Sequence, residues 1–262
     1  MLLRLLWLSL VVALCTSTAY GATIVIDRAS NQLYIVGKIV PGDYESFKFS
    51  LRNGTEPVNA VNIVSPGGSV VEAIQIGRLI RRLSLPTNAP SLASFAPEAR
   101  KFVCSTAARF DRTVSCTCVS ACFLIWAAGV QRSGNDIHIH RISYDRDFYG
   151  TLSPSEASAK YQEALQIVRV YLREMEIPDS IFETMVSMPS YATVPLKEAN
   201  SLTWPPSFGE WLTARCGPPT RARDSTCEFN QVGGAIRQRS KHSEPRKIDW
   251  AKLLLHLRIG ST

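Results

Sequence analysis

The segment "AVNIVSPGGSVVEAIQIGRLIRRL" (Ala60–Leu83) decides the fold, because it holds a strand, a sharp break and a helix in direct succession. The compact apolar run 60–65 predicts a strand, and the Pro-Gly-Gly sequence that follows ends it. Apolar residues then recur at helical spacing from Val70, and Ser69 is a suitable N-cap. A strand that passes directly into an amphipathic helix is a building unit of layered α/β folds.

The same alternation continues along the chain. Strands are expected at 23–26, 32–39, 60–65 and 136–141, and helices at 44–54, 69–83, 121–128, 153–177, 178–188 and 248–259. The Pro/Ser/Ala-rich segment 84–118 predicts little regular structure apart from one strand at 91–95, and we expect cysteine cross-links to order it. The expected fold class is therefore α/β, with layers of repeated strand–helix units.

A second stretch, "CVSACFLIWAAG" (Cys118–Gly129), places a hydroxyl in front of an almost wholly apolar segment. The pattern predicts a buried helix from Ala121, with Ser120 at its mouth. The first N–H groups of a helix lack intrahelical acceptors, so they can stabilise an oxyanion that develops beside the serine. Ser120 is then either a nucleophile, if a base removes its proton, or simply the cap of the helix.

Four histidines could supply that base, and two of them, His242 and His256, lie in the basic C-terminal region. The other two, His138 and His140, alternate along one expected strand. Alternation places both on the same face, so periodicity does not choose between them. The structural alternative is a histidine that is only solvated or packed in a short strand.

The N-terminal segment has the layout of a secretory signal, with one early cation, an apolar run and then small and polar residues. Small residues at Ala19 and Gly21 predict cleavage after Gly21. The alternative is an uncleaved segment that anchors the chain in a membrane. We expect a signal peptide at 1–21, a folded domain at 22–214, a basic extension at 215–262 and a periplasmic or secreted location.

Removal of the signal would leave six cysteines, and an even number in an exported protein predicts disulfide bonds. The last two, Cys216 and Cys227, could close a local loop. The other four bracket Ser120, and the sequence leaves their three pairings open; they are Cys104, Cys116, Cys118 and Cys122. The Cys-x-Cys-x3-Cys spacing is unusual for zinc and no histidine with ligand spacing lies near it, so we expect no metal and no cofactor.

The net charge of +7 belongs mainly to the C-terminal region. From Arg215 onward there are ten Lys/Arg and four Asp/Glu, a difference of +6, so the rest of the chain is close to neutral. A basic extension can contact nucleic acid or an anionic surface. For an exported protein we expect no nucleic-acid partner, and at most weak contact with a membrane surface or a partner.

Four motifs together resemble one family. "IVSPGGSVVEAIQIGRLIR" (Ile63–Arg81) resembles the Ser-Pro-Gly-Gly-Ser-Val segment of the Clp peptidase family, within the wider Clp/crotonase fold. "CVSACFLIWAAG" looks like that family's nucleophile turn, "IHIHR" (137–141) is similar to its histidine strand, and "VPLKEANSL" (194–202) is similar to its late segment. The resemblance covers about Gln32–Leu202 and is closest to exported, periplasmic Clp-like proteins.

The resemblance implies a Clp/crotonase-like layered fold and a serine peptidase that acts on peptides or unfolded proteins, as a homo-oligomer. It implies Ser120 as the nucleophile and His140 as the base. The implied oxyanion hole consists of backbone N–H groups from Gly67, Gly68 and Ala121.

Two departures from the family affect this reading. Where the family carries a third, acidic member of the triad, near Ser190–Tyr191, this chain has no carboxylate, although Asp179 or Glu183 could substitute. A Ser–His dyad without an orienting acid acts more slowly. The export signal also separates the chain from the family's ATP-dependent unfoldase partner, so a substrate has to arrive unfolded or as a short peptide.

Three other functions compete with the peptidase. The missing acid and the flanking cysteines favour a catalytically impaired protein that binds peptides or acts as a scaffold. A crotonase-type acyl-CoA enzyme fits the expected fold, but export and the serine turn argue against it. A Ser–Lys peptidase would need a desolvated lysine, and Lys101 is the nearest one before the serine.

Overall fold

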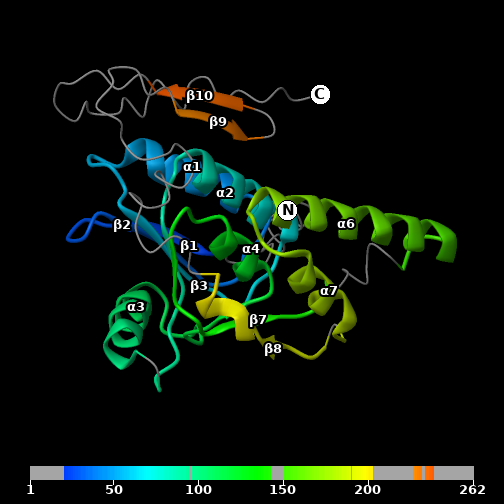
Figure 1. The fold of residues 1–262 in the computed structure, drawn as a ribbon. Helices are drawn as coiled ribbons and strands as arrows, with labels where there is room; N and C mark the ends of the chain where they lie inside the picture. Colours follow the sequence, from blue (N-terminus) through cyan, green and yellow to red (C-terminus); the bar gives the residue numbers. More distant parts are fainter. Residues whose placement is uncertain are drawn as a thin grey trace, which may run out of the picture.

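The computed structural model describes residues 21–94, 96–142, 150–189, 191–202, 227–231 and 234–238 (Figure 1). Its main sheet has the order β1 (Thr23–Asp27), β2 (Gln32–Val36), β3 (Ala60–Val64), β4 (Thr87–Asn88) and β6 (Arg132–Ser133). β1 is antiparallel to β2, and the other neighbours are parallel. A second sheet has the order β5 (Cys118–Val119), β7 (Ile137–Ile139) and β8 (Val194–Pro195), with only β8 antiparallel.

Helices connect these strands and cover them. They are α1 (Asp43–Asn53), α2 (Val70–Arg82), α3 (Pro97–Phe110), α4 (Ala121–Ala127), α6 (Pro154–Glu174), α7 (Asp179–Ser187) and the 3-10 helix η1 (Lys197–Asn200). Ser69 caps α2 as expected, since its side chain accepts a hydrogen bond from the Glu72 amide at 3.3 Å. The α/β class predicted from the sequence is confirmed.

The main sheet is buried on both faces, which gives the molecule its layers. Along β2, Leu33 and Ile35 enter the large core that α1, α2, α4, α6 and α7 share. The alternate residues, Tyr34 and Val36, pack on the opposite face against Val103 of α3. Figure 1 shows α3 on one side of the sheet and α1 and α2 on the other. Burial on both faces explains why the strands read as continuous apolar runs.

The helix α3 corrects the prediction for the segment 84–118. The strand expected at 91–95 is wrong for residues 91–94, which form no strand, and a 14-residue helix follows where little regular structure was expected. Pro97 is in the first turn, where its missing N–H costs no hydrogen bond. Only a narrow stripe with Val103 and Ala107 is buried, so the apolar periodicity was too weak to reveal the helix.

Helix α4 is buried on every side, with all seven residues at most 2% exposed. The last carbonyl groups of a helix have no intrahelical donor, and a buried end needs partners from elsewhere. Side chains of three other elements supply them: Tyr171 to Leu124 O at 2.6 Å, Thr87 to Trp126 O at 2.7 Å and Arg81 to Ala127 O at 3.4 Å. These contacts fix α4 against α2, α6 and the main sheet.

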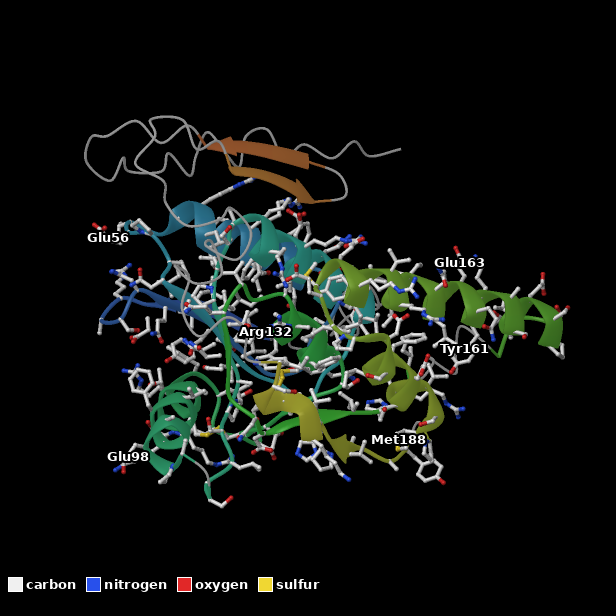
Figure 2. The ribbon with its side chains drawn as sticks, viewed as in Figure 1. Glu56, Glu98, Arg132, Tyr161, Glu163 and Met188 are labelled. Atoms are coloured by element: carbon white, nitrogen blue, oxygen red, sulfur yellow. A yellow bond between two sulfur atoms is a disulfide. The ribbon has the colours of Figure 1, made fainter. Side chains whose placement is uncertain are left out.

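Arg132 of β6 lies in the interior of the molecule, whereas Glu56, Glu98 and Glu163 lie at its periphery (Figure 2). Burial, with the nearby charge of Arg81 as a second cause, lowers the pKa of Arg132 to about 9. Its guanidinium carbon lies 5.8 Å from the centre of the Trp126 ring, a cation–π distance. This contact ties β6 to α4.

Some predicted elements lie outside the described residues. They are the signal peptide, of which only Gly21 is described, and the helix at 248–259. In the basic extension, β9 (Cys227–Gln231) and β10 (Gly234–Gln238) form an antiparallel pair that was not expected. In the described part of the chain, no helix combines the length and apolarity needed to span a membrane.

Gly77 of α2 tests how tightly α2 and α6 pack. A Cβ atom at this position would overlap the hydroxyl of Tyr171, which is fully buried. We expect Gly77→Ala to lower the free energy of unfolding by about 2 kcal/mol, because overpacking outweighs the gain of about 1 kcal/mol in helix propensity. Urea denaturation measures the difference.

The matched control is Gln75→Ala, an exposed position on the same helix. It should change the free energy of unfolding by less than about 0.5 kcal/mol. Equal stability of the two variants would contradict the packing described for Tyr171.

Candidate active site

Ser120 alone connects β5 to α4. Its backbone has φ 59° and ψ −120°, a positive φ that costs a non-glycine residue about 1–2 kcal/mol. The side chain makes no capping hydrogen bond, although Ser120 occupies the N-cap position. The capping alternative therefore does not describe this serine. A strained serine between a strand and a helix is the arrangement that exposes the nucleophile in hydrolases.

Backbone hydrogen bonds to two neighbouring segments hold this turn. The Ser120 amide donates to the His138 carbonyl at 2.9 Å, and the Val119 amide donates to the Ser65 carbonyl at 3.0 Å. Ser65 directly follows β3 and is itself fully buried. The serine is thus fixed between the histidine strand β7 and the Pro-Gly-Gly segment.

The structure selects one of the three cysteine pairings that the sequence left open. Cys104 and Cys116 lie at disulfide distance, with S–S 1.98 Å, as do Cys118 and Cys122, with S–S 2.06 Å. The second bond spans Ser120 and links β5 to the first turn of α4. Cys216 lies outside the described residues, so its pairing with Cys227 stays a prediction.

Gly67 lies directly against the serine turn. Its φ is +97°, and an added Cβ would lie 2.7 Å from Ser120 Cβ and 3.1 Å from the Ala121 amide nitrogen. Only glycine allows both this backbone conformation and this approach. The two motifs that are about 50 residues apart in the sequence are therefore in contact.

Ile39 supports the other side of this segment. Its amide donates to the Gly67 carbonyl at 2.9 Å, and its carbonyl accepts from the Ser69 amide at 2.8 Å. These two bonds form a parallel bridge between Ile39 and Gly68. A Cβ at Gly68, where φ is +137°, would overlap the Ile39 carbonyl oxygen.

The three amides expected in the oxyanion hole differ in what they bind. The Gly67 amide donates to Ser65 Oγ at 3.0 Å. The Gly68 amide points away from Ile39, as the geometry of a parallel bridge requires. The Ala121 amide is the first of α4 and has no intrahelical acceptor. Among the described residues, neither the Gly68 nor the Ala121 amide has a hydrogen-bond acceptor.

His140 follows β7, in which Ile137 and Ile139 face the core. Its Nδ1 lies 2.6 Å from the Arg141 carbonyl oxygen. A carbonyl oxygen only accepts, so Nδ1 carries the proton and Nε2 presents a lone pair in the neutral ring. Within the described residues no hydrogen bond joins His140 to Ser120 Oγ.

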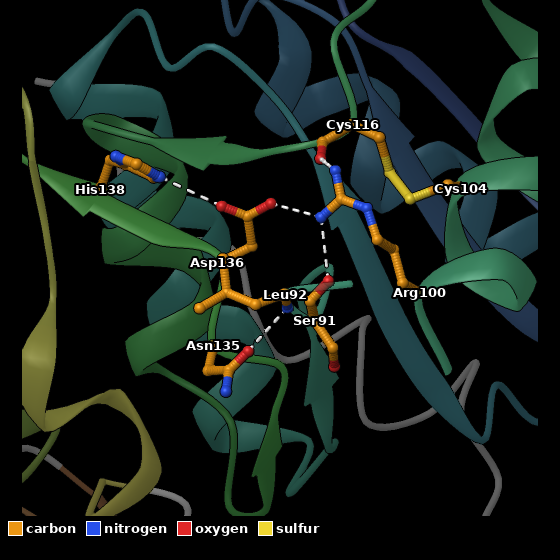
Figure 3. Close-up of polar contacts among 8 residues, drawn as sticks. All are labelled: Ser91, Leu92, Arg100, Cys104, Cys116, Asn135, Asp136 and His138. Carbon is orange, nitrogen blue, oxygen red and sulfur yellow. Dashed lines mark hydrogen bonds and ion pairs between the residues drawn. A yellow bond between two sulfur atoms is a disulfide. The ribbon is translucent and has the colours of Figure 1, made fainter. Parts of the chain in front are cut away.

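His138 is part of a different network (Figure 3). Its Nε2 lies 3.1 Å from Oδ1 of the buried Asp136, and the other carboxylate oxygen pairs with Arg100 of α3. Arg100 also donates to the carbonyl groups of Ser91 and Cys116, at 2.9 and 3.1 Å. Asp136 was not predicted as a partner of either histidine, although the spacing Asp-x-His-x-His is that of side chains on one face of a strand.

The carboxylates proposed as substitutes for the missing acid are engaged elsewhere. Asp179 accepts hydrogen bonds from Arg173 at 2.9 Å and from Arg169 at 3.1 Å, and these partners hold the pKa of Asp179 far below its usual range. Glu183 lies 3.9 Å from Arg169. Tyr191 is 90% exposed, and Ser190 lies outside the described residues. No carboxylate therefore orients His140 in the described structure.

Two other predicted features concern lysine and metal. Lys101 is exposed on α3, so its amine is not desolvated as a Ser–Lys mechanism requires. Over the described ranges, no group of three or more His, Cys, Asp or Glu side chains is arranged to hold a metal ion.

No family model matches the chain, and no curated protein matches its sequence. Among solved structures, ClpP1 from Listeria monocytogenes is similar with a TM-score of 0.42 and 13% identity, over 67% of this chain and 88% of that one. A mutant of the 1510-N membrane-bound stomatin-specific protease in complex with a substrate peptide has a TM-score of 0.42 and 14% identity, and the match covers 85% of this chain and 94% of that one. The ClpP protease catalytic domain from Plasmodium falciparum has a TM-score of 0.37 and 14% identity, and the match covers 65% of this chain and 79% of that one. Identities this low transfer no residue role to this chain.

Gly67→Ala tests the contact between the glycine segment and the serine turn. We expect the variant to react with a serine-directed phosphonate at least about 100-fold more slowly, because the new methyl group displaces Ser120 and the Ala121 amide. Mass spectrometry of the labelled peptide measures the rate, and circular dichroism confirms that the variant is folded.

Gly42→Ala is the matched control for this experiment. Gly42 has nearly the same φ, +99°, but an added Cβ would have no neighbour within 4 Å. It carries the same backbone strain without the collision, so its labelling rate should stay within about threefold of the unmodified protein. Equal losses in both variants would show that strain, and not contact with Ser120, is responsible.

Proposed function

We propose that this chain is an exported serine peptidase that hydrolyses peptides with Ser120 as nucleophile and His140 as base. The observation that carries the proposal is the state of Ser120: it lies at a positive φ, its hydroxyl does not cap α4, and Gly67 packs against it. The four motifs shared with the Clp peptidase family support the same reading. Two disulfide bonds, of which Cys118–Cys122 is buried, agree with an oxidising, periplasmic or secreted location.

The first chemical step is attack of Ser120 Oγ on the carbonyl carbon of the peptide bond. His140 Nε2 accepts the hydroxyl proton as the new C–O bond forms. The imidazolium then returns this proton to the departing amine as the C–N bond breaks, which leaves an ester on Ser120. Water hydrolyses the ester in the same way and restores the serine.

The tetrahedral intermediate carries a negative oxygen, and the amides of Gly68 and Ala121 are the donors that we assign to it. Both N–H groups lack acceptors among the described residues, and Ile39 and α4 hold the two segments in place. Each such donor contributes about 10²–10³ to the rate. Gly67 permits the close approach, while its own amide binds Ser65.

In this proposal the Arg141 carbonyl orients His140 in place of an acid. A neutral carbonyl fixes the tautomer, but it stabilises the imidazolium less than a carboxylate does. We therefore expect slow turnover of short or unfolded peptides. Self-association, which the resemblance to the Clp family implies, belongs to the same proposal.

Labelling of Ser120 by a fluorophosphonate is the direct test. The purified mature protein should be modified at Ser120, and Ser120→Ala should abolish the label. His140→Gln should slow the reaction by about 10²–10⁴-fold, because the general base is lost.

His138→Gln is the matched control, since His138 lies on the same strand two residues away but binds Asp136. It should change the labelling rate by less than about tenfold. A folded protein that takes no label sinks the hydrolase proposal, and a larger effect at His138 than at His140 assigns the base to the His138–Asp136 pair.

A second function is peptide binding without hydrolysis. It is favoured because Asp179, a candidate for the missing acid, is hydrogen-bonded to Arg169 and Arg173 instead.

The pairing of Ile139 with Val194, continued by one residue, places Thr193 opposite His140. Thr193→Asp would therefore bring a carboxylate beside the histidine.

If the chain is a slow peptidase, we expect Thr193→Asp to raise the rate of peptide hydrolysis at least about tenfold, because an acid stabilises the imidazolium. Thr193→Asn, of the same size and uncharged, is the control and should leave the rate unchanged. If neither variant nor the unmodified protein hydrolyses peptides that it binds, the binding function replaces the proposal.

A further inference from the structure

Asp43, the first residue of α1, is a buried carboxylate without a cation. It is 4% exposed, and its Oδ2 accepts hydrogen bonds from the amides of Val40 at 2.8 Å and Ala22 at 3.2 Å. No salt bridge to Asp43 is formed within the described ranges. Burial raises the pKa of Asp43, and the nearby charge of Glu72 adds to this effect. An unpaired buried charge is costly, so a cation placed beside Asp43 would stabilise the folded chain.

The residue that touches this carboxylate is the one at which the sequence predicts a new N-terminus. Before cleavage, the Ala22 nitrogen is a neutral amide with a single hydrogen. After cleavage following Gly21, the same nitrogen becomes an ammonium group with three hydrogens and an ordinary pKa of about 8. We propose that processing after Gly21 creates a buried ion pair between the Ala22 α-ammonium and Asp43.

The packing around Gly21 agrees with this assignment. A Cβ at position 21 would lie 2.6 Å from Asp43 Oδ1 and 2.8 Å from Val40 Cγ2. The unprocessed chain thus passes directly over the carboxylate, and a larger residue at position 21 would require the Asp43 or Val40 side chain to shift. Loss of Gly21 opens the space beside Oδ1, so that both carboxylate oxygens become accessible to the ammonium group.

This ion pair lies close to the segment that supports the candidate active site. The Asp43 carboxylate holds the Val40 amide, and the preceding residue, Ile39, forms the bridge to Gly68. Ile39 also binds the Gly67 carbonyl and the Ser69 amide. Processing would therefore stabilise the backbone on which both glycines rest.

The charges that face the site allow the pH dependence to be stated. Glu72 of α2 is the second carboxylate, and its Oε2 accepts from the Tyr44 amide at 2.7 Å. Glu45 of α1 and Lys38 are exposed on neighbouring turns, and neither pairs with Asp43 in the described structure. Asp43 raises the pKa of the ammonium group above its unfolded value of about 8. The added stability is complete only while Asp43 is ionised and the ammonium group is charged. It is lost at acid pH as Asp43 takes up a proton, and it is lost above about pH 8 as the pH rises through the raised pKa of the ammonium group.

The test compares two mature chains that differ by one residue, one starting at Ala22 and one at Gly21, each ending at Thr262. The chain that starts at Ala22 should melt about 3–8 °C higher at pH 7, since it alone places the ammonium group on Asp43. The difference should disappear above about pH 10. Asp43→Asn, which keeps the size and the hydrogen-bond acceptor, should remove the difference at every pH.

Equal melting temperatures at pH 7, or a difference that survives in Asp43→Asn, would overturn the proposal. Mass spectrometry of the full chain after export from a bacterial host should give the mass of a protein that starts at Ala22, and any other start also overturns it. Melting needs no hydrolysis, so this result is independent of the function proposed for Ser120.

Discussion

The complete burial of α4 is the constraint on which the rest of the structure depends. The last carbonyl groups of a helix without solvent contact need protein donors in place of water. At the carbonyl end, Tyr171, Thr87 and Arg81 supply the donors and draw α6, β4 and α2 around it. At the amide end, one strained residue, Ser120, connects β5 to α4. The first amide of the helix has no acceptor among the described residues, and this end of the helix faces the glycine segment.

The candidate site arises where two strand-to-helix connections meet. One connects β3 to α2 through Gly67 and Gly68, and the other connects β5 to α4 through Ser120. Neither connection is self-supporting: Ile39 holds the first by two backbone bonds, and β7 holds the second through the His138 carbonyl. Side chains add to these backbone supports: Ser65 Oγ accepts from the Gly67 amide, and the disulfide between Cys118 and Cys122 spans the serine turn.

Local patterns in the sequence were sufficient for the strands β1, β2, β3 and β7, for the helices α1, α2, α4, α6 and α7, and for the serine turn. The capping role of Ser69 and the break at Pro-Gly-Gly follow from neighbouring residues, and so does the helix after Ser120. Helix α3 escaped detection because its buried stripe is narrow. The network of Asp136 with Arg100, and the contact of Ala22 with Asp43, join residues 36 and 21 positions apart, and no periodicity encodes such contacts. Alternation along a strand does not distinguish His138 from His140, whereas the structure gives the two rings different partners, Asp136 for His138 and the Arg141 carbonyl for His140.

The disulfide between Cys118 and Cys122 links the conformation of Ser120 to the oxidation of the chain. The bond closes a small covalent ring whose middle residue is Ser120, and both sulfur atoms belong to fully buried residues. In the reduced chain, non-covalent packing alone opposes the relaxation of that residue to an ordinary backbone angle. Oxidation therefore does more than hold the domain together, because it is the covalent step that completes the serine turn.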